Sequence, residues 1–446
     1  MDTGDTAWVL ASAALVLLMT PGLALFYGGM VRAKSVLNMM MMSFGALALI
    51  SVLWVLYGYS VAFGNDVGGG LLGSPTEFFG LSKLIGTAGL DKGFAATHLV
   101  FTIPSLAFVA FQAVFAIITV ALISGAIADR ARFGPWMVFA GIWATVVYFP
   151  VAHWVFAFNG AQSAKGGWIA NKLLAIDFAG GTAVHINAGA AGLALALVLG
   201  KRVGWKRDPM RPHNLPLVMI GAGLLWFGWF GFNAGSALGA NGQAAEVWVT
   251  TMVATGAAAL GWLLVEKLRD GHATTLGAAS GAVAGLVAIT PSCASLSPIG
   301  SIALGLLAGA LCALAVSLKY RFGFDDSLDV VGVHLVGGAF GSVAIGFLAA
   351  PQTVSGAKGL LYGGGMDGLE LLGKQALAVV AVGTFSFVGA YIIGTIIDKT
   401  MGFRCSEEEE ISGIDLSIHA ESAYELASFT GSGYTSGASK KERVDA

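Results

Sequence analysis

The chain has 446 residues, of which 56% are hydrophobic and only 11% are charged, and its formal net charge is −2. Because a soluble domain usually carries about 25% charged residues, this chain has too little charge to cover a globular surface. The near-neutral balance, without a basic patch interleaved with aromatic residues, gives no sign of a nucleic-acid partner. The three cysteines are far apart, so the sequence indicates neither a disulfide framework nor a cysteine metal site.

Apolar residues come in long blocks, and the first four blocks meet or exceed the roughly 20 residues that a membrane-spanning helix needs. The sequence therefore predicts an all-α polytopic membrane protein with eleven transmembrane helices. The N-terminal sequence MDTGDTAWVL lacks the basic region of a signal peptide, so we expect the first block to be retained. The predicted spans, in chain order, are Trp8–Met30, Val36–Phe63, Leu99–Ala128, Phe133–Phe158, Phe178–Leu199, Leu215–Leu238, Val247–Val265, Ala273–Ile289, Ile299–Leu318, Val330–Ala349 and Leu371–Ile397.

Lys and Arg gather on one set of alternate loops, which predicts that these loops are cytoplasmic. This set holds Arg32, Lys34, Arg130, Arg132, Lys201, Arg202, Lys206, Arg207, Arg211, Lys267, Arg269, Lys319 and Arg321. The other set holds fewer basic residues, namely Lys83, Lys92, Lys165, Lys172, Lys358 and Lys374. The N-terminus is then outside and, with an odd number of spans, the C-terminal tail is inside.

Glycines at four-residue spacing recur in the later segments. Gly277, Gly281 and Gly285 form a doubled G-x-x-x-G pattern, and Gly305 and Gly309 form another. Such spacing lets helix backbones approach closely in lipid, where no hydrophobic force drives helices together. We interpret both patterns as close packing rather than as a binding site.

Two histidines fall inside predicted spans, where an ionisable group is costly and marks a functional site by default. His185 lies eight residues after Asp177, and His334 lies five residues after Asp329. The contexts DFAGGTAVHINAGAAG and DVVGVHLVGGAFGS both run from an aspartate through glycine and a β-branched residue to the histidine. Spans 1–5 and 6–10 are therefore predicted to form an inverted five-helix repeat, followed by a long eleventh helix, with both histidines on the pseudo-two-fold axis.

Two imidazoles in contact predict a path for a small polar solute or a proton, because each ring donates and accepts hydrogen bonds and titrates near neutrality. The alternative is two unrelated core histidines, each bonded to a backbone carbonyl, which explains a single histidine better than a symmetric pair. A metal site would need further ligands, and no Cys, Glu or third His stands beside the two in the sequence.

Aromatic residues cluster in LLWFGWFGFNAGSA, residues 224–237, and Phe111 and Phe115 lie four residues apart on one face of the third span. Aromatic rings at a pore mouth hold a cation through the ring quadrupole, and the hydroxyl of Ser236 adds a hydrogen-bond acceptor. The alternative is ordinary packing, and composition does not decide which rings face a pore.

Several stretches are similar, in order, to those of the ammonium transporter family (Amt/Mep/Rh), and of its bacterial Amt branch in particular. The resemblance covers most of the chain and rests on PGLALFYGGMVRAKSVLNMM, FQAVFA, DRARF, DFAGGTAVHINAGAAGL, RPHNLP, GWFGFNAGSA, SGAVAGLVAITPSC and DVVGVHLVGG. It implies a homotrimer in the bacterial plasma (inner) membrane, with one conduction path per subunit and an outward N-terminus.

The resemblance also divides the chain into a transmembrane transporter domain, residues 1–398, and a cytoplasmic regulatory tail, residues 399–446, whose end we expect to be disordered. The tail segment EEEEISGIDLSIHAESAYE resembles the family's ordered tail, which packs under the trimer and responds to a PII-type signalling protein.

Roles for individual residues follow from the resemblance. His185 and His334 would be the twin pore histidines, and Phe115 and Phe232 would be the stacked rings that close the outer mouth. Asp177 would shape the nearby vestibule rather than ligate the substrate. The vestibule that recruits ammonium would be lined by Phe111, Phe115, Phe156, Ser236 and Asp177. The residues that would line or support the path are Trp229, Tyr148 and Thr290.

One position departs from the family pattern. Where the family commonly has a vestibule Trp, after H-x-V, this chain has Phe156 in HWVF. Because Phe is a weaker cation–π partner than Trp, we expect weaker recruitment of ammonium unless Trp154 or Trp168 compensates.

The resemblance implies ammonium transport without a cofactor. Ammonium would be bound outside, deprotonated and conducted as ammonia along the imidazoles, since a narrow apolar bore imposes a large desolvation cost on an intact cation. Whether the proton follows through the histidines or returns outside stays open at this point. A sensor would be indicated by a fused signalling domain, for which the tail is short, and the aromatic vestibule disfavours an Rh-type gas channel. No nucleophile–base set in the loops indicates an enzyme.

Overall fold

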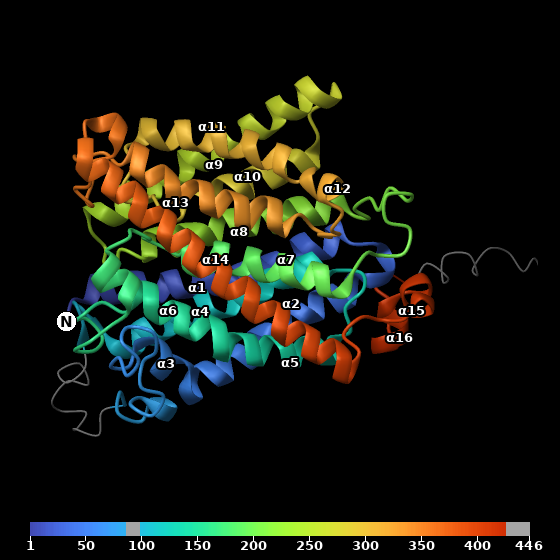
Figure 1. The fold of residues 1–446 in the computed structure, drawn as a ribbon, viewed down its shortest axis with the longest axis horizontal. Helices are drawn as coiled ribbons and strands as arrows, with labels where there is room; N and C mark the ends of the chain where they lie inside the picture. The colour runs from blue at the N-terminus through green and yellow to red at the C-terminus, as the bar shows by residue number, and fades with distance from the viewer. Residues whose placement is uncertain (86–98, 425–446) are drawn as a thin grey trace, which may run out of the picture.

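The computed structural model describes residues 1–85 and 99–424, so Lys92 and the predicted disordered end of the tail lie outside the described residues. The helices form an elongated bundle, with the start of the chain at one end and the tail helices α15 (Glu407–Ser412) and α16 (Ile414–His419) at the other (Figure 1). In the described part, ten helices are long and apolar enough to cross a membrane, and the shorter apolar helix α10 (Thr275–Ile289) is the eleventh. The predicted all-α architecture of eleven spans is confirmed.

The first five spans come from residues 3–199. They are α1 (Thr3–Met30); a 3-10 turn (Ala33–Ser35) with α2 (Val36–Leu53), a π-helical segment (Trp54–Gly58) and α3 (Tyr59–Phe63); α4 (Ser105–Ile123) with a 3-10 turn (Ser124–Ile127); α5 (Phe133–Trp143), a π-helical segment (Ala144–Tyr148) and α6 (Phe149–Phe156); and a π-helical segment (Gly181–Ile186) with α7 (Asn187–Leu199).

The remaining spans come from residues 215–401. They are α8 (Leu215–Gly235); α9 (Gly242–Asp270); α10; α11 (Pro298–Ala315) with α12 (Leu318–Phe322); a π-helical segment (Val331–Leu335) with α13 (Val336–Leu348); and α14 (Gly365–Met401). Between the spans lie the antiparallel strands β1 (Leu99–Val100) and β2 (Ile103–Pro104), a π-helical segment (Ile169–Leu173) and two 3-10 turns (Phe79–Leu81 and Leu360–Tyr362).

Several predicted boundaries differ from the observed ones by a few residues, and two of the differences have a clear physical reason. The third span was predicted from Leu99, but the first residues of that block pair as β1 and β2, and the helix begins only after Pro104, which favours an extended residue before it. The seventh span was predicted to end at Val265, whereas α9 continues to Asp270 and ends at Gly271 in the left-handed conformation. The charged residues 266–270, which follow the predicted end of this span, are therefore the last turn of α9.

The contacts between spans follow the predicted repeat. The first span, α1, packs along α8, the sixth span. The fifth and tenth spans also meet, because the π-helical start of each contacts the α-helical part of the other. An inverted repeat of spans 1–5 and 6–10 requires both pairings. The two histidine-bearing spans share a further feature, since each opens with a π-helical segment that contains the histidine.

The predicted G-x-x-x-G patterns lie where helices approach closely. A Cβ atom added at Gly309 of α11 would lie 2.0 Å from the carbonyl oxygen of Ala258 in α9, and one added at Gly305 would lie 2.2 Å from that of Ala254. Any side chain at these positions would push the two backbones apart. The glycines thus let α9 and α11 pack at van der Waals distance without a hydrophobic driving force.

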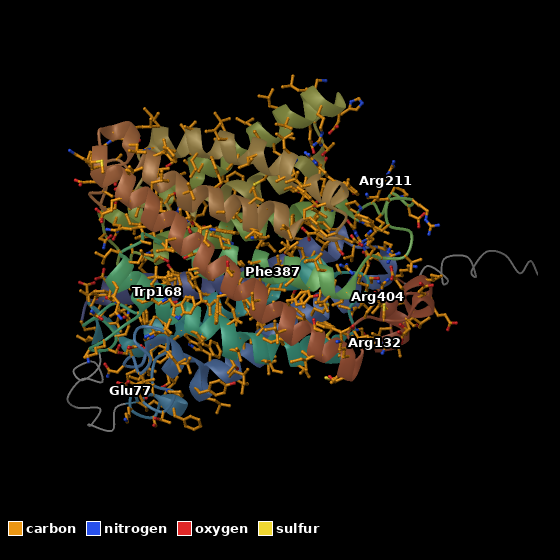
Figure 2. All side chains as sticks on the ribbon, viewed as in Figure 1. Glu77, Arg132, Trp168, Arg211, Phe387 and Arg404 are labelled. Carbon is orange, nitrogen blue, oxygen red and sulfur yellow. The ribbon has the colours of Figure 1, made fainter. Side chains whose placement is uncertain are left out.

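Arginines of the loops predicted to be cytoplasmic lie at the tail end of the bundle (Figure 2). Arg132, Arg211 and Arg404 lie at the end that carries α15 and α16, whereas Glu77 and Trp168 lie at the opposite end, with the N-terminus (Figure 2). The loops predicted to be cytoplasmic therefore share one end with the tail.

We expect Gly309→Ala to destabilise the bundle by about 1–3 kcal/mol, because the new methyl group overlaps the carbonyl of Ala258. The measurement is the apparent unfolding temperature of the purified protein in detergent. Gly256→Ala, on α9, is the matched control, because nothing lies within 4 Å of a Cβ added there. Equal unfolding temperatures for the two variants would contradict the packing argument.

Candidate functional site

The carboxylate of Asp177 organises the start of the fifth span. It accepts hydrogen bonds from the backbone N–H groups of Gly180, Gly181 and Thr182 at 2.8, 2.6 and 2.7 Å, and from the hydroxyl of Thr182. A carboxylate that covers the free N–H groups at a helix start stabilises that end. Because both oxygens are engaged in this way, Asp177 shapes the wall beside it rather than offering a free acceptor.

The same arrangement recurs at the start of the tenth span, on Asp326. Its carboxylate accepts from the backbone N–H groups of Val330 at 3.1 Å and Val331 at 2.7 Å. Asp326 lies eight residues before His334, which repeats the spacing found in the fifth span. The capping aspartate and the histidine are thus one structural unit used twice.

The predicted pairing of Asp177 with Asp329 is therefore wrong. The carboxylate of Asp329 accepts a hydrogen bond from the ammonium group of Lys319 at 2.6 Å and caps no helix start. The sequence comparison chose it because it also precedes a glycine and a β-branched residue. Only the backbone hydrogen bonds identify Asp326 as the counterpart of Asp177.

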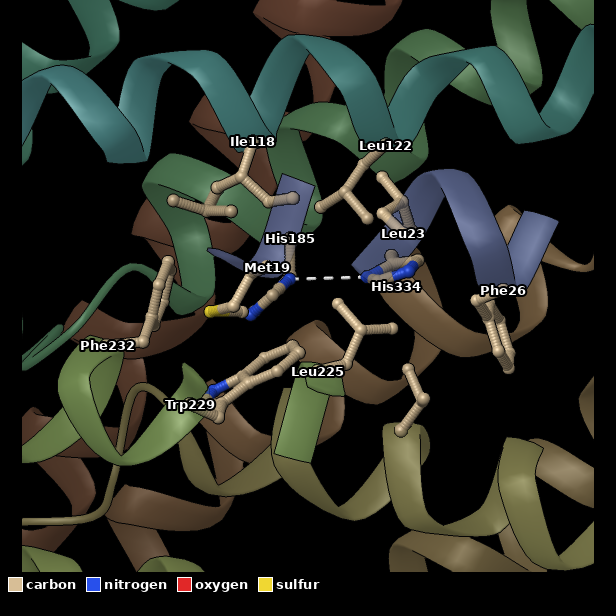
Figure 3. A pocket seen from close by; sticks show the side chains of 12 residues that line it. Met19, Leu23, Phe26, Ile118, Leu122, His185, Leu225, Trp229, Phe232 and His334 are labelled. Carbon is tan, nitrogen blue, oxygen red and sulfur yellow. Dashed lines mark hydrogen bonds between the residues drawn. The ribbon is translucent and has the colours of Figure 1, made fainter. Parts of the chain in front are cut away.

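The two span histidines bond to each other. Nδ1 of His185 lies 3.2 Å from Nδ1 of His334, with ring centroids 5.3 Å apart (Figure 3). One ring must hold a proton on Nδ1 and donate it, while the other accepts. Both side chains are buried, and Nε2 of His185 has no hydrogen-bond partner. A polar atom of this kind in an apolar wall is available to a small hydrogen-bonding guest.

A small apolar cavity surrounds the histidine pair; we call it the histidine cavity. Its volume is about 10 Å³, which is room for about one molecule the size of water. Apart from the histidines its lining is apolar or aromatic, and comes from Met19, Leu23, Phe26, Ile118, Leu122, Val184, Leu225, Trp229, Phe232 and Val283. A guest in this cavity would therefore find hydrogen-bond partners almost only on the two imidazoles.

Phe115 of α4 and Phe232 of α8 form a stacked pair, with ring centroids 4.1 Å apart and planes inclined by 16°. Both side chains are buried. Phe232 lines the histidine cavity, whereas Phe115 lines a larger cavity on the other side. The ring pair therefore separates the two cavities, and one ring must move before a solute passes between them.

The larger cavity, which we call the aromatic vestibule, has a volume of about 640 Å³ and lies at the N-terminal end of α1. All five residues predicted for a vestibule contribute to its wall: Phe111, Phe115, Phe156, Asp177 and Ser236. Phe156 presents its edge to the ring of Phe115 at 85°, with the centroids 6.4 Å apart.

Neither Trp154 nor Trp168 lines the aromatic vestibule, so the predicted compensation for Phe156 is not supported. The indole N–H of Trp154 donates to the carbonyl oxygen of Leu71, and its ring packs on Phe385. Among the residues that form the vestibule wall, the aromatic side chains are all phenylalanines.

The three supporting residues differ in placement. Trp229 stacks on His185, with centroids 5.3 Å apart and planes inclined by 19°, and its indole N–H donates to the hydroxyl of Thr290 at 2.8 Å. Tyr148 lies apart from both cavities and packs against Trp143. The geometry thus brings Trp229 to the histidines and joins Thr290 to Trp229, whereas Tyr148 lines neither the histidine cavity nor the aromatic vestibule.

A third cavity, the basic vestibule, lies at the tail end of the bundle and has a volume of about 530 Å³. Its basic side chains are Arg202, Lys206, Arg207, Arg211 and Lys319. Arg202 is held in place by Asp325, whose oxygens accept from the guanidinium at 2.9 Å. Burial alone would favour a neutral carboxyl, but the hydrogen bonds from Arg202 hold the pKa of Asp325 below its ordinary value.

The three cavities follow one another along the helices. On α8, Phe232 lines the histidine cavity and Ser236, one turn later, lines the aromatic vestibule. On α1, Phe26 lines the histidine cavity and Met30, one turn later, lines the basic vestibule. The wide aromatic vestibule, the small histidine cavity and the wide basic vestibule therefore lie in series along the bundle.

Comparisons with known proteins agree with this geometry. Residues 7–424 match the model of the Ammonium Transporter Family. The chain belongs to this family. The ammonium transporter of Mycobacterium tuberculosis is 61% identical over 443 residues, covering 97% of this chain and 92% of that protein. The ammonium transporter of Bacillus subtilis is 46% identical, covering 95% and 99%. This chain is therefore an ammonium transporter and not an enzyme.

Solved structures share the fold of this ammonium transporter. Saccharomyces cerevisiae Mep2 is 33% identical, with a TM-score of 0.79 and a coverage of 91% of each chain. A protein described as a sensor Amt protein is 28% identical, with a TM-score of 0.82, and covers 93% of this chain and 98% of its own.

The prediction from sequence missed several polar residues of the aromatic vestibule wall, among which Gln112 is the buried one. Gln112 lines the aromatic vestibule between Phe111 and Phe115, and its side-chain oxygen is buried without a hydrogen-bond partner. The signal was present in the stretch FQAVF, where an amide stands inside an apolar helix. It was overlooked because one polar residue in a membrane helix is usually satisfied by a neighbouring helix.

Proposed function

We propose that this transporter recruits ammonium in the aromatic vestibule, that the proton of ammonium passes to the unpartnered Nε2 of His185, and that ammonia crosses the histidine cavity while the proton follows along the two imidazoles. The observation that carries the proposal is the 3.2 Å contact between His185 and His334 inside a cavity of about 10 Å³. A constriction of this size excludes a hydrated cation but accommodates a molecule as small as ammonia.

Deprotonation of ammonium explains how the transporter would select ammonium over potassium. An intact cation in an apolar bore loses its hydration shell without compensation, which costs many kcal/mol. Ammonium avoids this cost because it sheds a proton, whereas potassium, which is close to it in size, has none to shed. The stacked pair of Phe115 and Phe232 supports the idea, because an ion in contact with these two apolar rings would find no polar group on them to replace its hydration shell.

The entrance offers weak but suitable contacts for a cation. The phenylalanine faces attract positive charge. The hydroxyl of Ser236 donates to the carbonyl oxygen of Phe232 at 2.8 Å, so its lone pairs remain free to accept from ammonium. The unpartnered amide oxygen of Gln112 is a second acceptor in the same wall.

For the proton we favour passage through the rings. An imidazole takes up a proton on one nitrogen and releases it from the other. Nε2 of His185 is unpartnered, and Nδ1 of the same ring contacts His334. These two contacts give a proton a route across the constriction, and transport by this route carries charge.

We also propose that residues 399–446 regulate transport from the cytoplasm as a unit distinct from the membrane domain. The supporting observation is the way α15 and α16 bind to the loops. The buried carboxylate of Glu410 accepts from Arg32 at 3.3 Å, from Arg404 at 3.1 Å and from the backbone N–H of Val203 at 2.8 Å. Val203 follows Arg202 of the basic vestibule, so movement of the tail would reach the exit.

For the whole molecule we propose a homotrimer in the bacterial plasma membrane, with the N-terminus outside and the basic end of the bundle in the cytoplasm, where a PII-type protein would bind. The gathering of basic loops and tail at one end supports this orientation (Figure 2). Native mass spectrometry should give three subunits per particle, and a monomeric mass would overturn the proposed assembly.

We expect His185→Ala to abolish most of the ammonium current or to admit potassium, because the hydrogen-bonding bridge across the constriction is lost. Current is recorded from proteoliposomes on supported membranes with ammonium, methylammonium and potassium. His272→Ala, in an exposed loop, is the control and should behave like the unaltered protein. If His185→Ala keeps the full ammonium current and still excludes potassium, the proposal is wrong.

We expect Phe156→Trp to lower the half-saturating ammonium concentration roughly two- to fivefold, because an indole binds a cation more strongly than a phenyl ring by about 0.5–1 kcal/mol. Concentration-dependent currents from the same preparation measure this change. Phe227→Trp adds an indole on the exposed surface of α8, 57% exposed, and should leave the value unchanged. An unaltered or higher value in Phe156→Trp would contradict a cation-binding role for this wall.

We expect Glu410→Gln to release the tail, because two arginines lose a buried carboxylate. Limited proteolysis should cut the tail at least several times faster, and the ammonium current should change with it. Glu407→Gln, at an exposed position of the same helix, is the control. A released tail with an unchanged current would rule out regulation through this contact.

A further inference from the structure

A chain of buried polar side chains leads away from the histidine cavity through three helices. The indole N–H of Trp229 donates to Thr290, as described above. The hydroxyl oxygen of Thr290 lies 3.2 Å from Oδ1 of Asn233, and the amide nitrogen of Asn233 donates to the hydroxyl of Thr251 at 3.0 Å. We call these four side chains, on α8, α9 and α10, the indole network.

The far end of the indole network has no part in the wall of any of the three cavities. Thr251 and Asn233 are fully buried and line neither vestibule nor the histidine cavity. Burying an amide and a hydroxyl costs free energy unless each is hydrogen-bonded. Polar side chains also join membrane helices to one another, so the tests below separate that packing role from a role at the constriction.

The network fixes the orientation of one ring. The indole of Trp229 has a single polar atom, its N–H donor. Thr290 holds this atom, and its own hydroxyl also lies 2.7 Å from the carbonyl oxygen of Leu286, which keeps the hydroxyl oxygen in one place. Asn233 lies one turn after Trp229 on α8, and its amide oxygen lies against the hydroxyl of Thr290. Its amide nitrogen donates to Thr251, so Thr251 determines which way the amide of Asn233 faces.

We propose that Thr251, through Asn233 and Thr290, is a positioning residue for the transport step: it sets the plane of Trp229 and thereby the orientation of His185 toward His334. This inference rests on the proposed function of the histidine cavity. The stacking of Trp229 on His185 transmits the effect, because a rotated indole would no longer support the imidazole face. Thr251 touches neither substrate nor histidine and acts only through this chain of contacts.

The first test replaces the hydroxyl of Thr251 while keeping its shape. We expect Thr251→Val to lower the maximal ammonium current roughly threefold to tenfold, with an unchanged half-saturating concentration, because the aromatic vestibule stays intact. Thr251→Ser restores the hydroxyl and should restore the current. Thr255→Val is the matched control, since Thr255 is also buried on α9 and its hydroxyl donates only to the backbone carbonyl of Thr251.

The second test asks whether the effect passes through the indole N–H. Trp229→Phe keeps an aromatic ring but removes the donor, so Thr251→Val should cause no further loss in this background. If the double variant loses as much current as the two single losses multiplied together, the inference is wrong, while the proposed function stays in place. An unchanged current in Trp229→Phe would also overturn it, whereas failure of the proposed function itself would appear in His185→Ala.

Unfolding temperature and protein amount are measured for every variant. If Thr251→Val and Thr255→Val lower the current per molecule equally, or if Thr251→Ser does not rescue, Thr251 serves only the packing of α9 and the inference is wrong. A shift confined to the half-saturating concentration would likewise contradict a role at the constriction.

Discussion

Polar groups in the middle of this bundle must find their partners inside the protein, because no water is available at that depth of a membrane. His185 and His334 meet this requirement at their Nδ1 atoms by bonding to each other, whereas Nε2 of His185 has no partner. Each ring is brought to that point by a π-helical start of its span and by an aspartate that covers the free N–H groups there. The placement of a proton-active pair in apolar surroundings therefore depends on two carboxylates that never touch it.

The path on either side of the histidines is asymmetric, although the fold is built from a repeat. One entrance is wide and lined with phenylalanine faces, and the other is wide and basic. A cation is attracted by aromatic faces and repelled by lysine and arginine. The two ends of the bundle therefore differ in their side chains, although the backbone is built from a repeat.

Two kinds of contact hold different parts of the bundle together: close helix packing in the second half and ion pairs at the tail end. In the second half, glycines bring α9 and α11 to backbone contact, which holds the helices that carry Thr251 and its neighbours. At the tail end, the buried carboxylate of Glu410 joins loops that lie far apart in the sequence. The first arrangement is rigid, because a backbone contact cannot be adjusted. The second consists of ion pairs that a binding partner can exchange for its own.

The sequence by itself determined the class of protein, the number of spans and the two histidines, because long apolar blocks and rare ionisable groups are visible without a structure. The phenylalanines of the vestibule were predicted only from the resemblance to a family. It did not determine the partner of Asp177, since two aspartates precede His334 and only backbone hydrogen bonds select Asp326. Nor could it show that Tyr148 lies apart from the cavities or that Thr251 connects to Trp229. These contacts join helices that are distant in the chain. Helical periodicity shows which face of its helix a residue occupies, but it does not show which other helix packs against that face. Only the packing of the spans decided them.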